Sequence, residues 1–178
     1  VLFSSSIGDS IKWSFVTGLI VNVITVYWFG LNSGAGVVPA LISMVAAILY
    51  LSIFWILFGF LSSWYNKITG HGLSLVPLIW VFTEFLRGFG PLSFPWINLA
   101  LTQTFCLPLV QIADVTGSMG ISFWIVLLNV IIYTAIRSKN VEIKILYMGG
   151  LLILVIYLLG YFRISSIENR EINNVIKY

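Results

Sequence analysis

The chain has 178 residues, of which 60% are hydrophobic and 8% are charged, and its mean hydropathy is +1.04. Soluble domains carry about 25% charged residues, so this composition excludes a water-soluble globular protein and predicts that the lipid bilayer is the solvent. The net charge of +3 is small and spread along the sequence, which indicates no nucleic-acid-binding surface.

Apolar runs divide the chain into predicted membrane spans. A transmembrane helix needs about 20 apolar residues, usually roughly 17 to 25. Four clear runs and one shorter run are candidates: 13–29, 37–62, 73–87, 121–136 and 145–162. The second run exceeds a hydrocarbon core of about 30 Å, so its helix should tilt. The short run, 73–87, fits a re-entrant or interfacial segment equally well when taken alone.

Basic residues predict the orientation of these spans, because positive charges in short loops mark the cytoplasmic side. They gather in two loops, at Lys67, His71, Arg137, Lys139 and Lys144. Since an even number of spans must separate two cytoplasmic loops, 73–87 has to cross together with 121–136. The prediction is an all-α, polytopic transmembrane helix bundle of about five spans. In it, the long 88–120 loop and the polar 163–178 tail are extracytoplasmic.

Glu84 and Arg87 end the short span. Three positions apart on a helix, they share a face, and Trp80 lies one turn before Glu84 on the same side. Charges at membrane depth are costly and count as functional candidates. An ion pair at a helix end, with Arg87 snorkelling to the interface, is the alternative. We favour function as a hypothesis because the pair leads directly into an unusual loop.

That loop is rich in glycine, proline and aromatic residues, which interrupt regular helix and suit the headgroup level of a membrane. Phe94, Pro95 and Trp96 form its most compact aromatic group, although an ordinary aromatic belt would explain it too. Further along, a helix over 97–115 would place Gln103, Gln111 and Asp114 roughly on one face. That face would then be the wet side of an interfacial helix. The last residues, 172–178, show a weak strand pattern.

The sequence contains no complete catalytic set. It has no Ser/His/Asp grouping, no metal-ligand spacing and no phosphate-binding glycine loop, so we expect no metal and no cofactor. The single cysteine, Cys106, excludes an internal disulfide. The only histidine, His71, falls on the opposite side of the predicted membrane, which leaves Cys106 without an activating base.

Several motifs together resemble the membrane domain of apolipoprotein N-acyltransferases. They are W-x-x-x-E-F-L-R-G from Trp80 to Gly88, F-P-W from Phe94 to Trp96, the glutamines Gln103 and Gln111, and G-x-x-G-I-S-F from Gly117 to Phe123, followed by Asn129. The resemblance implies eight membrane helices and an extracytoplasmic nitrilase-like domain with a Glu-Lys-Cys triad. It also implies that a thiolate takes an acyl chain from a phospholipid donor as a thioester. The thioester then acylates the N-terminal diacylglyceryl-cysteine of an apolipoprotein.

On this resemblance, 1–162 is the transmembrane domain and 163–178 is a linker into a nitrilase-like domain that is missing here. The chain would then be a fragment, inactive alone, that anchors the enzyme in the bacterial cytoplasmic (inner) membrane and gives lipids access. Glu84 and Arg87 would fix the start of the loop, and the F-P-W group would line the lipid approach. Arg87 would also suit a headgroup phosphate.

Two other classes stay open from the residues alone. One is a non-catalytic membrane scaffold, such as a domain fused to a polyprenol-phosphate glycosyltransferase. The other is a small transporter or channel, with Glu84 and Asn129 as pathway residues. A transporter predicts paired broken helices, and the sequence holds no second copy of the 84–96 pattern.

Overall fold

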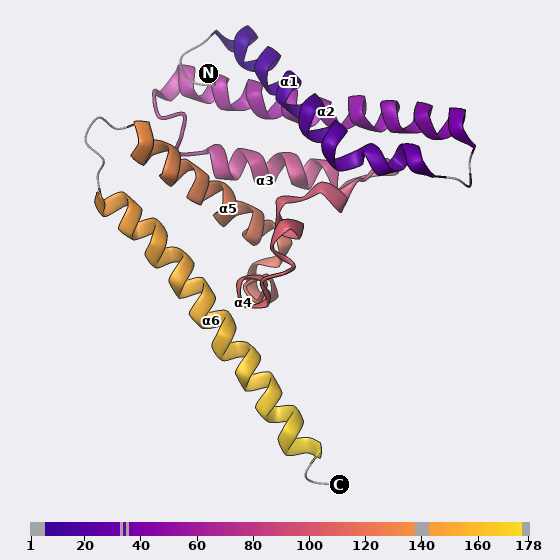
Figure 1. The fold of residues 1–178 in the computed structure, drawn as a ribbon. Helices are drawn as coiled ribbons and strands as arrows, with labels where there is room; N and C mark the ends of the chain where they lie inside the picture. Colours follow the sequence, from indigo (N-terminus) through magenta and orange to yellow (C-terminus); the bar gives the residue numbers. More distant parts are fainter. Residues whose placement is uncertain (1–5, 33, 35, 138–142, 176–178) are drawn as a thin grey trace. The chain divides into compact units, whose positions relative to one another are not determined.

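The computed structural model describes residues 6–32, 34, 36–137 and 143–175, and these residues form helices with no strand among them (Figure 1). In chain order the elements are α1 Ile7–Val26, η1 Tyr27–Leu31, α2 Val37–Thr69, α3 Val76–Arg87, η3 Pro95–Ile97, η4 Leu99–Gln103, α4 Leu107–Val110, α5 Ala113–Arg137 and α6 Ile143–Val175. The predicted all-α class is therefore confirmed. The chain divides into a first unit, Val1–Ile97, and a second unit, Asn98–Tyr178.

Among the residues that the structure describes, four helical segments are long and apolar enough to cross a membrane. They are Ile7–Leu31, Val37–Thr69, Ala113–Arg137 and Tyr147–Asn169, and each contains a predicted span or most of one. The shorter α3 has 12 residues, which gives a length of only about 18 Å. A fifth span at 73–87 therefore stays a prediction.

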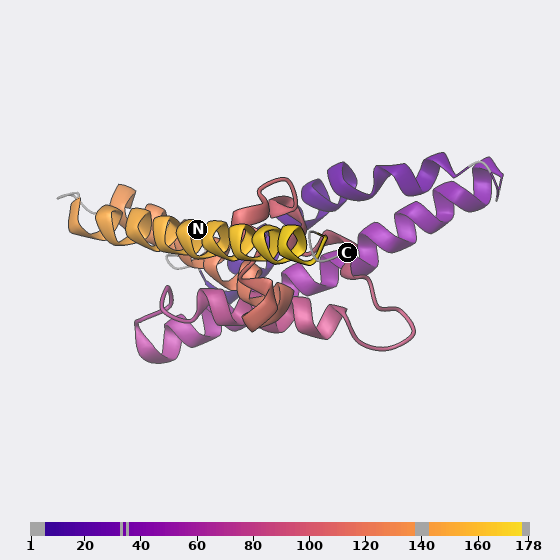
Figure 2. The ribbon, with the colours of Figure 1, turned by 90° about the horizontal axis from the view of Figure 1, so that it is seen from below.

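In the first unit, α1 packs along α2, as Figures 1 and 2 both show, and α2 also contacts α3. The buried positions of α1 recur every four residues: Ser10, Ser14, Gly18, Asn22 and Val26. This spacing puts small side chains on one face, where they let two helices approach closely. At Gly18 the two helices are in such close contact that an added Cβ would lie 2.5 Å from the Trp55 ring.

In the second unit, α5 and α6 pack around an apolar cluster of Ala100, Ile121, Trp124, Leu128 and Ile156. The backbone N–H of Ala100 donates to Ser122 Oγ at 3.1 Å, which ties η4 to α5. Gly160 of α6 lies so close to the Pro108 carbonyl of α4 that an added Cβ would collide with it.

The segment 95–112 does not form the continuous helix over 97–115 that would have placed Gln103, Gln111 and Asp114 on one face. It consists of short pieces, η3, η4 and α4, because Pro95 and Pro108 begin new turns and cannot donate a backbone hydrogen bond to a preceding one. The next helix begins at Ala113 rather than 121 and is interrupted at Gly117, whose φ is 67°. A left-handed φ of this kind favours glycine.

The polar 163–178 tail also differs from the prediction. Helix α6 continues to Val175, so the strand pattern at 172–175 is wrong, and 176–178 lies outside the described residues. The physical reason is the absence of a helix breaker: no glycine or proline follows Gly160 in the sequence. Whether the tail is extracytoplasmic stays a prediction.

Candidate functional site

The C-terminal half of α3 carries the candidate site in the first unit. The helix has Pro77 in its first turn, where a missing N–H costs nothing, and it ends at Arg87. The Gly88 N–H closes the last turn by donating to the carbonyls of Glu84 at 3.1 Å and Phe85 at 3.0 Å. Regular helix stops here because the sequence continues with Gly88, a turn at Gly90 and then Pro91.

Glu84 and Arg87 face each other in the interior. The relative exposure of the Glu84 side chain is 0% and that of Arg87 is 3%, and Arg87 Nη2 lies 3.7 Å from Glu84 Oε1. The Trp80 indole N–H donates to the same carboxylate oxygen at 3.0 Å. The predicted shared face of these three residues is confirmed. Since Arg87 is buried, snorkelling to the interface does not describe it, and a headgroup phosphate is not favoured as its partner.

Helix α2 supports this group through Trp80. The Trp80 ring packs edge-on against Trp55 at 5.0 Å and against Phe58 at 5.1 Å between ring centroids. Aromatic pairs in this geometry add stabilisation beyond their buried area. The indole that holds the Glu84 carboxylate is thus itself fixed by two rings of another helix.

Arg87 also holds the base of the loop that follows. Its backbone carbonyl accepts from the Phe94 N–H at 2.9 Å, and its Nη2 lies 3.5 Å from the Ile97 carbonyl oxygen. Residues 88–93 therefore leave α3 and return to the same residue. We call Glu84, Arg87 and Trp80, with these two loop contacts, the α3 clamp.

The structure divides the F-P-W group between core and surface. Phe94 is 8% exposed and packs in a cluster with Val26, Ile48 and Leu51, whereas Trp96 is 62% exposed. Pro95, also exposed, begins η3.

Two aromatic residues at the end of the first span complete this arrangement. Phe29 lies 5.9 Å from Phe94, and Trp28 lies 6.4 Å from Trp96, between ring centroids. The sequence did not predict this pairing between the end of the first span and the loop.

The predicted polar group of the second unit is only partly brought together. Gln111 lines a pocket with Arg163, and Asp114 forms an ion pair with Arg163 at 2.7 Å. Gln103 does not line that pocket and donates to its neighbour Thr102 at 3.0 Å. Sequence reasoning missed Arg163, although its position as the first charged residue after the last apolar run is a signal.

Asn129, the other pathway candidate, is exposed and hydrogen-bonded within its own helix. Its Nδ2 donates to the Ile125 carbonyl at 2.8 Å. This contact is the ordinary local one of a polar side chain in a helix, and it gives no support to a transport pathway.

Comparison with known proteins identifies the family. The family model for the apolipoprotein N-acyltransferase N-terminal domain matches residues 1–131. A Geobacter metallireducens apolipoprotein N-acyltransferase is 37% identical over 134 residues, which cover 71% of this chain and 25% of that protein. The Haemophilus influenzae enzyme of the same name is 27% identical over 84% of the chain and 29% of its own length.

The chain spans about a quarter of the length of these relatives. No solved structure gives a significant match. Because the family model covers well over half of the sequence, the chain belongs to the apolipoprotein N-acyltransferase family, which consists of membrane acyltransferases of lipoprotein biosynthesis.

Proposed function

We propose that this chain is the membrane part of an apolipoprotein N-acyltransferase. The whole enzyme would transfer an acyl chain from a phospholipid, through a thioester, to the N-terminal diacylglyceryl-cysteine of apolipoproteins. The Glu-Lys-Cys triad would be supplied outside these residues, in a nitrilase-like domain. The chain's apolar helices and its family make it a bacterial membrane protein, and we assign it to the cytoplasmic membrane.

The role we assign to the first unit is to present a lipid-contacting loop on a rigid base. The observation that carries this role is the α3 clamp. It holds the return of residues 88–93 against the end of α3. Within this segment Phe89 is 61% and Leu92 69% exposed, and Trp96, between the two clamp contacts, is 62% exposed. Exposed aromatic and aliphatic groups on a fixed base suit contact with lipid at the headgroup level. The loop would lie on the extracytoplasmic side.

The test is lipoprotein acylation by the whole protein. The gene that contains this chain is expressed in a bacterium depleted of its own N-acyltransferase, and the N-terminal lipopeptides are analysed by mass spectrometry. Triacylated lipopeptides are the expected product. A folded, membrane-inserted protein that leaves every lipopeptide diacylated would overturn the enzyme assignment and favour a scaffold.

Variants then test the clamp. Glu84→Gln and Arg87→Leu should lower acylation or the yield of folded protein more than Trp80→Phe. The first two remove one charge of a buried ion pair, whereas Trp80→Phe removes a single hydrogen bond to the Glu84 carboxylate and keeps both charges. Trp96→Ala should lower acylation without lowering yield, since its side chain is exposed. Normal acylation in both charge variants would reduce the pair to a dispensable contact.

A further inference from the structure

Helix α6 provides a depth scale for the second unit. It is apolar from 145 to 162, and Arg163 is the first charged residue after that run. The run is about 27 Å long, close to a hydrocarbon core of about 30 Å, so it crosses the core once. A charge that follows such a run lies at headgroup level. Residues before Arg163 therefore lie deeper, by about 1.5 Å for each position along the helix.

Two contacts place the segment that precedes α5 below headgroup level. The Pro108 carbonyl of α4 packs against Gly160, which is roughly 4.5 Å deeper than the first charge along α6. Ala100 of η4 belongs to the apolar cluster that contains Ile156, which is roughly 10 Å deeper. Residues 99–112, which we call the embedded segment, are thus attached to α6 at the depth of the acyl chains.

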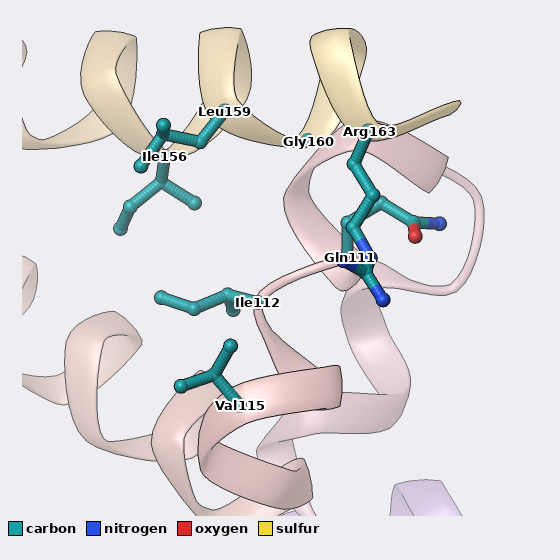
Figure 3. A pocket seen from close by; sticks show the side chains of 7 residues that line it. All are labelled: Gln111, Ile112, Val115, Ile156, Leu159, Gly160 and Arg163. Atoms are coloured by element: carbon teal, nitrogen blue, oxygen red, sulfur yellow. The ribbon is translucent and has the colours of Figure 1, made fainter. Parts of the chain in front are cut away.

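Beyond this segment the chain returns to headgroup level. Asp114 Oδ2 lies 2.7 Å from Arg163 Nε. Figure 3 shows Gln111 beside Arg163. Ile112 instead faces Ile156, farther along α6 toward the hydrocarbon (Figure 3). The polar side chains of the two segments therefore meet at one depth and their aliphatic side chains meet below it.

The embedded segment satisfies its polar side chains locally, as hydrocarbon surroundings require. Thr102 Oγ1 donates to the Leu99 carbonyl at 2.7 Å. Thr104 Oγ1 donates to the Leu101 carbonyl at 2.9 Å. Gln103 Nε2 donates to Thr102 Oγ1 at 3.0 Å. Three consecutive polar side chains thus bond to atoms of the segment itself.

The side chains that the embedded segment turns outward are apolar. Phe105 is 99% exposed, Leu107 60% and Leu101 46%. Such side chains are unfavourable in water and favourable in hydrocarbon. The depth of the segment and the chemistry of its outer face therefore point to the same surroundings.

We propose that the embedded segment is inserted into the leaflet on the Arg163 side and that its outer face contacts lipid acyl chains. The sequence pattern placed all of 88–120 outside the membrane, whereas residues 99–112 would belong to the membrane domain. The bilayer is the partner because the depth comes from α6 and the outer face carries no charge. The insertion goes beyond the proposed enzyme activity and does not depend on it.

Fluorescence quenching measures where Phe105 lies. A small fluorescent amino acid replaces Phe105, Leu154 or Glu168 in the whole protein, one position at a time, and each variant is reconstituted in phosphatidylcholine vesicles. Leu154 lies in the apolar run of α6 and Glu168 lies beyond Arg163, and both are exposed, so they are the lipid control and the water control. Phosphatidylcholine with a doxyl group on an acyl chain quenches from the hydrocarbon. Iodide on both sides of the membrane quenches from water.

We expect position 105 to behave like position 154. Doxyl lipid should quench it about threefold more strongly than position 168, and iodide about threefold less, because an ion is excluded from hydrocarbon. Iodide quenching as strong as at position 168 would place the segment in water and overturn the insertion. Weak quenching by both agents would mean that protein covers Phe105, which would overturn it equally.

A charge variant gives a second measurement. Phe105→Asp should lower the amount of membrane-inserted protein by about threefold, because a carboxylate at membrane depth is costly. Ile167→Asp is the matched control, since it adds the same charge on α6 beyond Arg163, at a side chain that is 43% exposed. Its amount should stay at the wild-type level. Equal amounts of the two variants would contradict the depth of the segment, whatever the acylation assay shows.

Discussion

The two units hold their charged side chains in opposite ways. In the first, Glu84 and Arg87 are almost wholly buried and lie 3.7 Å apart. In the second, Asp114 and Arg163 lie at 2.7 Å but are about half exposed. The shorter contact is the weaker one in energy, because water and salt screen an exposed pair. A buried pair is costly to break, since one charge is left without its partner.

The contacts between helices can be compared in the same way. The first unit contains a buried hydrogen bond between two helices, from Asn22 Nδ2 to Ser52 Oγ at 3.1 Å. The second unit relies on its apolar cluster and on the close approach of Gly160 to Pro108. Both units thus combine close glycine contacts with a buried hydrogen bond, but the first alone buries an ion pair among the described residues.

Breaking the buried pair should give the largest effect. Arg87→Leu removes the cation and leaves the Glu84 carboxylate buried, at a cost of about 3–5 kcal/mol in the free energy of unfolding. Tryptophan fluorescence during denaturation in detergent measures this. The double variant Glu84→Gln/Arg87→Leu should regain part of the loss, because no charge remains. Wild-type stability in Arg87→Leu would show that burial does not set the strength of this pair.

Testing the shape-based packing comes next. Gly160→Ala should cost about 1–3 kcal/mol of unfolding free energy, because its Cβ would strike the Pro108 carbonyl and force the backbone to move. Gly150→Ala, on the same helix with nothing within 4 Å of an added Cβ, should instead stabilise by about 0.5–1 kcal/mol. The comparison is made by thermal unfolding, and equal shifts would rule out the close approach.

The buried hydrogen bond between α1 and α2 should matter less. Asn22→Ala removes the donor to Ser52, and such bonds in membrane proteins contribute about 0.6 kcal/mol on average. The loss is limited further because Asn22 Oδ1 has no hydrogen-bond partner in the part of the chain described here. Ser43→Ala, at an exposed position of α2, is the control and should leave the midpoint of unfolding unchanged. A loss above about 2 kcal/mol would contradict this ranking.

The exposed ion pair should give the smallest change in stability. Arg163→Gln should cost less than about 1 kcal/mol, and even this difference should disappear in 1 M salt, where the Debye length is about 3 Å. Unfolding midpoints at low and high salt measure it. A large loss that persists at high salt would place Asp114–Arg163 among the structural contacts of the second unit.

The sequence predicted contacts that depend on local spacing. Glu84 and Arg87 share a face because they are three positions apart on a helix, and the ion pair confirms this. Helix class and most span positions followed from apolar run length. The Asp114–Arg163 pair was not predicted because its members are 49 residues apart in the chain, and periodicity within one helix carries no information about such a contact.

Backbone interruptions were harder to place than helices. Prolines indicated that the 97–115 region is uneven, but not that it would separate into η3, η4 and α4. The start of α5 was placed too late, because Gly117 permits a local break without ending the helix. The extension of α6 to Val175 was missed because polarity was taken to end the helix, whereas a polar segment without glycine or proline can stay helical.

The α3 clamp makes residues 88–93 a good place for insertion. The segment leaves α3 at Arg87, and its return is held at the same residue by the Phe94 N–H on the Arg87 carbonyl and by the Arg87 guanidinium on the Ile97 carbonyl. Doubling the length of a closed loop costs only about 0.6 kcal/mol. An epitope tag between Gly90 and Pro91 should therefore leave the packing of the helices unchanged. Whether the tag is accessible from outside intact cells would report directly which side of the membrane this loop occupies.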